Sequence, residues 1–133
     1  MIFLQILICL AALYVFLMHP RIRRADSSPF HGTFFAHRGL HDNNRQIPEN
    51  SLAAFQRAVD AGYGIELDVQ LSADRIPVVF HDATLSRMCG IDRRVNELTF
   101  AELRQLSLVN TKEQIPSFQE ALALVNGKVP LLV

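Results

Sequence analysis

The chain has 133 residues, which is enough for one domain of modest size. Its 13 basic and 13 acidic side chains cancel, which argues against a nucleic-acid partner, because nucleic-acid-binding proteins usually carry a basic face. The two cysteines, Cys9 and Cys89, lie far apart in an apolar leader and a later loop, so we expect no structural disulfide.

Residues 1–18 form an apolar run without a charged side chain. As a helix the run would extend about 27 Å, similar to the hydrocarbon core of a bilayer, which is about 30 Å thick. It therefore predicts a single transmembrane anchor in contact with bilayer lipid. Arg21, Arg23 and Arg24 follow it, and the positive-inside rule places that side in the cytoplasm. A cleaved signal peptide and a buried helix are the alternatives, but the run lacks a basic start and a polar face.

Residues 19–32 are basic and then polar, which is typical of a linker, and the folded domain is expected at 33–133. The patterning of this domain predicts strand, helix, strand, strand, helix, helix and strand. Such alternation favours an α/β fold with a mainly parallel sheet. The four strands are expected at about 33–37, 64–71, 76–81 and 129–133.

Capping signals mark the three helices. Asn50 is expected to cap the first helix, which carries its apolar side chains on one stripe. Thr99 with Glu102, and Ser117 with Glu120, have the spacing of a capping box at the start of the other two.

The four polar residues between the second and third strands are too few for a parallel crossover and favour a hairpin. If Leu71 pairs with Ile76, then Glu66 lies opposite His81, and Asp68 lies opposite Val79. Directly opposed residues share a face, as do residues two apart in one strand. This register predicts that Glu66, Asp68 and His81 converge on one side.

Two adjacent carboxylates repel each other and raise each other's pKa, and a cation between them would relieve the conflict. Oxygen ligands favour a hard ion such as Mg²⁺ or Ca²⁺. The alternative is a sheet with one polar face in water, which produces the same Glu66-x-Asp68 spacing.

A second group of polar residues follows the first strand. His37 ends that strand, and the carboxyl ends of parallel strands gather active groups in α/β folds. Arg38 offers a planar fork suited to phosphate, and Gly39 allows a close backbone turn. Asp82 is expected either to orient the nearby His81 or to form a turn.

These motifs together resemble the glycerophosphodiester phosphodiesterase family. The resemblance implies the amino-terminal part of a (β/α)₈ (TIM) barrel, preceded here by the single transmembrane helix. It also implies hydrolysis of a glycerophosphodiester to glycerol 3-phosphate and an alcohol, with one divalent ion, Mg²⁺ or Ca²⁺. The matching segments are HRG at 37–39, PENS at 48–51, ELDVQLSADRIPVVFHD at 66–82, LTFAELRQL at 98–106 and IPSFQEAL at 115–122.

The resemblance also implies roles for individual residues. His37 and His81 match the general acid and base, and Arg38 matches the residue that contacts phosphate. The metal ligands match Glu66 and Asp68, with Glu49 as a further ligand or a neighbour of the metal. The family often has an arginine at the position of Arg87, to which the sequence assigns no role.

The chain departs from the family in length. A (β/α)₈ barrel needs about 250 residues. The family's third metal carboxylate lies in a strand that resembles LLVEIK, and the final LLV of this chain matches only the start of that strand. We therefore expect the 133 residues alone to be inactive. A lysophospholipase D-type activity on membrane lipids and a non-catalytic, membrane-anchored phosphate-binding module are the alternative functions.

Overall fold

The computed structural model describes residues 2–18, 28–42 and 46–133, which fall into two units. The first unit, Met1–His31, contains helix α1 (Ile2–Met18) and the short 3₁₀ helix η1 (Ser28–Phe30). All the described residues of α1 are exposed. The predicted basic cluster of Arg21, Arg23 and Arg24 lies outside the described residues.

The described residues include no helix with both the length and the apolar character needed to span a membrane. The predicted transmembrane anchor is therefore unconfirmed.

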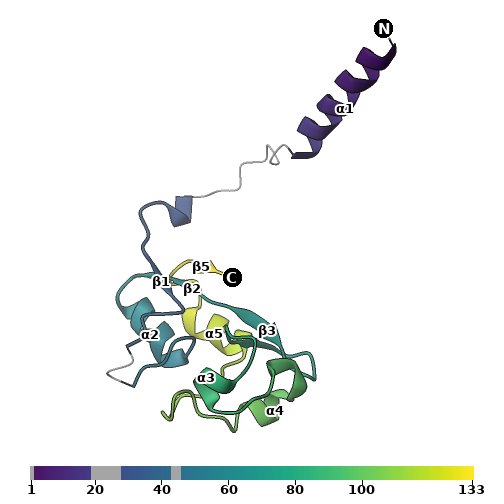
Figure 1. Ribbon diagram of the computed structural model, residues 1–133. Coiled ribbons are helices and arrows are strands. Elements are labelled where there is room, and N and C mark those ends of the chain that lie inside the picture. The colour runs from purple at the N-terminus through teal and green to yellow at the C-terminus, as the bar shows by residue number, and fades with distance from the viewer. Residues whose placement is uncertain (1, 19–27, 43–45) are drawn as a thin grey trace. The chain divides into compact units, whose positions relative to one another are not determined.

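The second unit, Gly32–Val133, is built on a three-stranded parallel sheet (Figure 1). The strands lie in the order β1-β2-β5, so β2 is central and pairs in parallel with both neighbours. This arrangement confirms the expected α/β fold with a parallel sheet. The strands are β1 (Phe35–His37), β2 (Gly64–Glu66) and β5 (Leu131–Leu132).

Helices α2 (Leu52–Asp60) and α5 (Phe118–Val125) pack against each other (Figure 1). Helix α2 also contacts β2, and α5 contacts a further strand, β4 (Pro77–Val79), which pairs with β3 (Val69–Leu71) in a hairpin. The Ser117 capping box of α5 is present as predicted. The predicted cap of α2 was wrong by one residue. Asn50 has a left-handed φ of 55°, whereas Ser51 has the extended backbone of a cap, and its hydroxyl accepts a hydrogen bond from the Ala54 amide.

Three short helices follow the hairpin. The helix predicted after Thr99 is α4 (Phe100–Leu103), and its capping box is present. The sequence did not predict α3 (Ser86–Cys89) or the 3₁₀ helix η3 (Val95–Glu97), because a single turn has no apolar period to detect.

The predicted strand 64–71 is in fact two strands that belong to different sheets. β2 ends at Glu66, and β3 (Val69–Leu71) forms a separate antiparallel hairpin with β4 (Pro77–Val79). The chain leaves the parallel sheet between these two strands, at residues 67–68.

The predicted hairpin register was wrong by one residue. Leu71 pairs with Pro77 and Val69 with Val79, so Asp68 does not oppose Val79, and Glu66 does not oppose His81. The turn explains the shift, because Ser72 and not Leu71 closes it. The Ser72 amide donates to the Ile76 carbonyl at 3.1 Å, and the Ser72 hydroxyl accepts from the Ile76 amide at 2.9 Å.

The hairpin lies between two hydrophobic clusters. Alternate residues of β4 and its extension point to opposite sides, so Val78 and Phe80 pack with α3 and α4 residues, whereas Val79 packs with Phe55 of α2 and Ile65 of β2. All five side chains are buried. The hairpin is therefore held on both faces, which fixes the position of the segment that leads to His81.

Candidate active site

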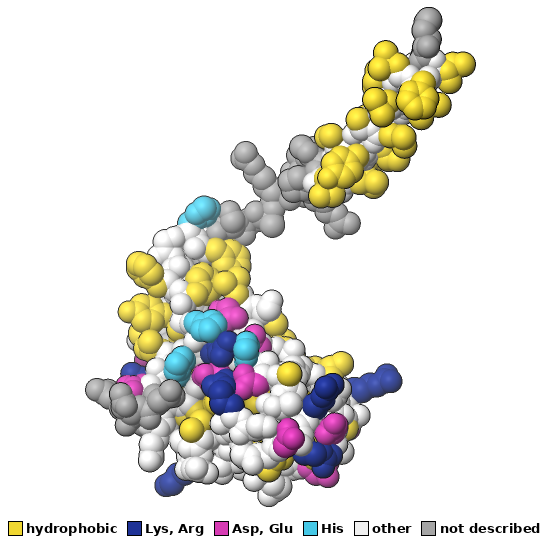
Figure 2. Space-filling view, in the orientation of Figure 1, with side chains coloured by type: hydrophobic (Ala, Val, Ile, Leu, Met, Phe, Trp, Pro, Cys, Tyr) yellow, Lys and Arg dark blue, Asp and Glu magenta, His cyan; other side chains and the backbone are white. Residues whose placement is uncertain are grey.

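The site begins where β1 and β2 end. The parallel register pairs His37 with Glu66, so their side chains emerge side by side at the carboxyl edge of the sheet. His37 Nε2 lies 3.9 Å from Glu66 Oε2. Figure 2 shows histidine, arginine and acidic side chains gathered on one face of this unit.

The turn after β1 directs Arg38 into the acidic residues. Arg38 and Gly39 both have positive φ, 57° and 82°, and the Arg38 amide donates to Glu66 Oε2 at 3.2 Å. The guanidinium Nη1 donates to Glu49 Oε1 at 2.9 Å, and Nε lies 3.6 Å from Asp68 Oδ2. Arg38 therefore contacts all three carboxylates that the sequence singled out.

Shared contacts with Arg38 place Glu66 and Asp68 at one site, as predicted. Ile65 and Leu67, which alternate with them, are buried on the other side. The part of the common-face prediction that concerns Glu66 and Asp68 agrees with these contacts, but the register that would have set His81 opposite Glu66 does not form.

The loop that contains the PEN motif (residues 48–50), here called the PEN loop, is hydrogen-bonded to the turn after β1. The Asn50 amide donates to the Arg38 carbonyl at 2.9 Å, and the Asn50 side-chain Nδ2 donates to Asp68 Oδ2 at 3.4 Å. Asn50 is buried, so its polar side chain requires partners. The sequence indicated only a helix cap at Asn50, and this contact with a predicted metal ligand was not predicted.

His81 reaches the site by an indirect route. Its Nδ1 lies 2.8 Å from Asp82 Oδ1, and Arg87 contacts both Asp82 and Glu49. The two predicted catalytic histidines are thus connected through a series of charged groups rather than by a shared strand face. Of the two roles considered for Asp82, orientation of His81 is the one that this contact supports.

The arginines control the ionisation of the carboxylates. Burial alone would raise the pKa of Glu49, but hydrogen bonds from Arg87 and Arg38 outweigh this effect and hold the pKa below its usual value. The hydrogen bonds from Arg87, assisted by His81, lower the pKa of Asp82 to about 2 against the opposing effect of burial. Both carboxylates are therefore ionised at neutral pH.

Glu66 and Asp68 fit a divalent cation better than Glu49 does. Their side chains are 32% and 31% exposed, and their recorded contacts within the described residues are all 3.2 Å or longer. The buried Asn50 Oδ1 also makes no hydrogen bond in the described part of the chain, whereas Arg38 Nε is an unsatisfied donor that suits an anion such as phosphate. These carboxylates thus retain free capacity to coordinate a hard ion.

Glu49, in contrast, is engaged on both oxygens by arginine. Across residues 2–18, 28–42 and 46–133, no group of three or more His, Cys, Asp or Glu side chains is arranged to hold a metal. The predicted metal set of Glu49, Glu66 and Asp68 therefore stays a prediction, although all three carboxylates contact Arg38.

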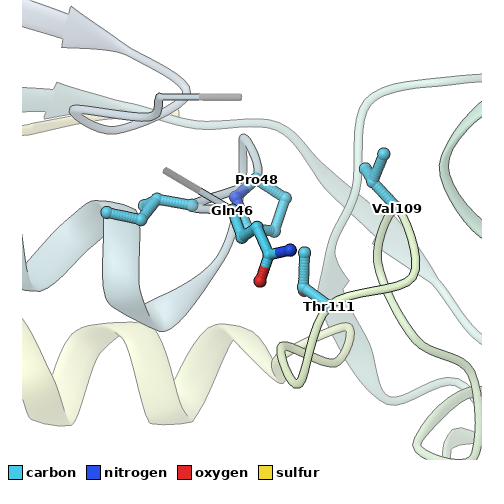
Figure 3. Close-up of a pocket in the computed structure, with 5 residues that line it drawn as sticks. Gln46, Pro48, Val109 and Thr111 are labelled. Carbon is cyan, nitrogen blue, oxygen red and sulfur yellow. The ribbon is translucent and has the colours of Figure 1, made fainter. Parts of the chain in front are cut away.

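A pocket lies next to the PEN loop. Figure 3 shows Gln46 and Pro48 on one side, facing Val109 and Thr111 of a later loop, and Ile47 completes the lining. The lining is mainly apolar and contains none of the predicted site residues. The pocket is therefore not the polar centre of the site.

Comparison with known proteins decides the family. The sequence profile of the Glycerophosphoryl diester phosphodiesterase family matches residues 37–133, which is more than half of the chain. The chain belongs to this family. The recognition based on the HRG, E-x-D and HD segments is thereby confirmed.

Individual members of the glycerophosphodiester phosphodiesterase family show the extent of the similarity. A glycerophosphodiester phosphodiesterase from Caldanaerobacter subterraneus subsp. tengcongensis is 38% identical over 100 residues, covering 70% of this chain and 40% of the relative. Human glycerophosphodiester phosphodiesterase 1 is 38% identical over 97 residues, covering 66% of this chain and 28% of the relative. The chain therefore spans less than half the length of these relatives.

Solved structures of glycerophosphodiester phosphodiesterases share the fold. An Oleispira antarctica phosphodiesterase, solved with the product sn-glycerol-3-phosphate, has a TM-score of 0.67 and 35% identity, covering 79% of this chain and 44% of that one. The Thermotoga maritima glycerophosphodiester phosphodiesterase has a TM-score of 0.64 and 35% identity, covering 76% and 42%. These neighbours are TIM-barrel enzymes, and the α/β unit of this chain corresponds to part of such a barrel.

Proposed function

We propose that the full-length protein hydrolyses glycerophosphodiesters to glycerol 3-phosphate and an alcohol, with the help of one divalent ion. The observation that carries this proposal is the register of β1 and β2, which sets His37 beside Glu66 and turns Arg38 toward Glu66 and Asp68. An imidazole, a guanidinium and two carboxylates at one edge are the groups that phosphodiester hydrolysis needs.

Glu66 and Asp68 would hold the ion, either Mg²⁺ or Ca²⁺, because their oxygens keep room for a further partner. A bound divalent ion would supply positive charge that stabilises the phosphoryl oxygens as negative charge develops. Arg38 would bind the same phosphate from the protein side. Glu49 holds the Arg38 guanidinium through its 2.9 Å hydrogen bond, and this contact favours a positioning role.

His37 and His81 would carry the protons. Both rings are exposed, so they can reach a substrate, and imidazole exchanges protons near neutral pH. One ring would accept the proton of the attacking hydroxyl group, and the other would donate a proton to the leaving oxygen. His81 is held at Nδ1 by Asp82, which leaves Nε2 for this exchange.

The test is the release of glycerol 3-phosphate from glycerophosphodiesters by the full-length protein. His37→Ala and His81→Ala should each lower the rate by about 10²- to 10⁴-fold, the usual contribution of a general acid or base. His31→Ala is the matched control, because His31 is also exposed but lies outside the second unit. Release that survives in both active-site variants would contradict the proposal.

Two further measurements separate the alternative functions. Faster turnover of a diester with a long acyl chain would favour a lysophospholipase D-type activity. Phosphate binding without hydrolysis of any substrate would favour the non-catalytic module.

We also propose that α1 associates with a membrane and leaves the second unit in the cytoplasm. The support is that α1 carries no charged side chain and that its described residues are exposed. Carbonate-washed membranes should retain the full-length protein and lose a variant without residues 1–18. Equal release of both proteins would refute this proposal.

A further inference from the structure

Arg87 occupies an unusual position for a half-exposed arginine. Its guanidinium makes two hydrogen bonds to each of two carboxylates. Nε and Nη2 donate to Asp82 Oδ2 and Oδ1 at 2.7 and 2.9 Å, and Nη1 and Nη2 donate to Glu49 Oε2 and Oε1 at 3.2 and 2.6 Å. The two acceptor side chains are only 19% and 13% exposed. A paired, charge-assisted geometry of this kind is far more specific than an ordinary surface ion pair.

Each of these two carboxylates also contacts a side chain with a proposed role in the reaction. Asp82 Oδ1 lies 2.8 Å from His81 Nδ1, and Glu49 Oε1 accepts from Arg38 Nη1 at 2.9 Å. Arg87 of α3 lies 38 residues from Glu49 in sequence, so it joins the segment after β4 to the loop that contains the PEN motif. Among the described residues, the Arg87–Glu49 pair is the one ionic contact between these two segments.

The charges determine which nitrogen of His81 carries a proton. Asp82 is an ionised carboxylate and can only accept hydrogen bonds, so His81 Nδ1 must be the donor. The neutral ring then keeps its lone pair on Nε2. Among the described residues, Asp82 is the one ionic partner of His81. Arg87 pairs with the same carboxylate and so fixes its orientation.

We propose that Arg87 is a positioning residue: through Asp82 it holds His81 with Nδ1 protonated and Nε2 free, and through Glu49 it holds the Arg38 guanidinium. This inference rests on the proposed function for its catalytic meaning, but its geometry can be tested without turnover. Arg87→Lys is informative because one ammonium group cannot make paired contacts with two carboxylates.

The first experiment records ¹⁵N shifts of the His81 ring in the full-length protein across pH. The wild-type neutral ring should be predominantly in the Nδ1–H form. Arg87→Ala and Asp82→Asn should shift it toward a mixture with the Nε2–H form, and Arg87→Lys should give an intermediate shift. Free guanidinium, well below denaturing concentrations, should partly restore the wild-type shifts in Arg87→Ala.

Arg93→Ala provides the matched control. Arg93 is 50% exposed and Arg87 is 51% exposed, and Arg93 also pairs with a carboxylate, that of Glu97 at 2.8 Å. Its removal should leave the His81 shifts unchanged. Unchanged shifts in Arg87→Ala, or equal changes in Arg87→Ala and Arg93→Ala, would overturn the proposal. If Arg87→Ala does not fold, unchanged shifts in both Arg87→Lys and Asp82→Asn would overturn it equally.

The second experiment measures glycerol 3-phosphate release. Arg87→Ala should lower kcat by about 10- to 100-fold, as expected for a residue that orients functional groups through intermediates, and Arg87→Lys should be less affected. If the wild-type protein releases no product, the proposed function fails while the ring shifts still decide the positioning role. Normal kcat in Arg87→Ala, in an active protein, would contradict the role.

Discussion

Substitution of Gly39 by alanine tests how closely the turn after β1 must approach α2. Gly39 has a φ of 82°, and a Cβ at this position would lie 2.9 Å from both Ala54 Cβ and Phe55 Cδ1. It would also lie 3.0 Å from the Ala54 carbonyl carbon, which is backbone. Ala54 and Phe55 are fully buried, so neither can move aside without disturbing the core.

Two separable costs follow from this geometry. A left-handed conformation costs a residue with a Cβ about 1–2 kcal/mol. Overpacking against a buried helix adds about 1–3 kcal/mol. Gly39→Ala should therefore reduce the free energy of unfolding by about 2–5 kcal/mol, and it should displace Arg38 from the carboxylates.

Gly62→Ala separates the two costs. Gly62 has a similar φ of 71°, but a Cβ there would meet nothing within 4 Å, so only the conformational cost applies. Urea denaturation of the wild-type protein and both variants gives the free energies of unfolding. Gly39→Ala should be less stable than Gly62→Ala by about 1–3 kcal/mol. Equal losses in the two variants would refute the reasoning about close packing.

Three more predictions concern Asp82, Phe55 and Cys89. The folded state holds the pKa of Asp82 at about 2, below its usual 3.8, so its ionised form stabilises the fold above about pH 4, and this stabilisation is lost as the pH falls through 2. The full linkage would be about 2.5 kcal/mol, but solvent screening at the half-exposed Arg87 reduces our expectation to about 1 kcal/mol. Between pH 5 and pH 2, the free energy of unfolding should fall less steeply for Asp82→Asn than for the wild type. Parallel curves for the two proteins would count against the contact. Phe55→Ala should cost about 3–5 kcal/mol in urea denaturation, because the ring is fully buried among α2, β2 and α5, and a loss below 1 kcal/mol would be inconsistent with this core. Burial raises the pKa of Cys89 to about 11, so a thiol reagent at pH 8 should label it far more slowly than free cysteine in solution, and equal labelling rates would contradict its burial.

Local signals in the sequence predicted much of the fold. The capping boxes at Thr99 and Ser117 form as expected, because each needs only four consecutive residues. The strand that ends in His37 was likewise predicted, and Gly39 has the left-handed turn that its residue type suggested. These features depend on neighbours in sequence, which a pattern can represent.

Features set by longer-range contacts were missed. The hairpin register depended on which residue closes the turn, and Ser72 does so with its hydroxyl group, a choice that alternation of apolar residues does not reveal. The split of 64–71 into two strands follows from pairing of β2 with β1 and β5, which are distant in sequence.

The role of Arg87 was hidden for the same reason. Its contact with Asp82 spans only five residues, but its contact with Glu49 spans 38 and depends on how the two loops pack. Sequence motifs identified the reactive residues because these belong to short family signatures. They did not identify the residue that connects them, because no short pattern contains both of its partners.

The most direct test of the central claim is the metal dependence of glycerol 3-phosphate release by the full-length protein. After removal of divalent ions with a chelator, release should stop, and addition of Mg²⁺ or Ca²⁺ should restore it. Glu66→Gln and Asp68→Asn should need much more metal or remain inactive, whereas Glu97→Gln, a control at an exposed ion pair, should match the wild type. Undiminished release in chelator, or wild-type metal dependence in both site variants, would contradict the assignment of these carboxylates to a catalytic ion.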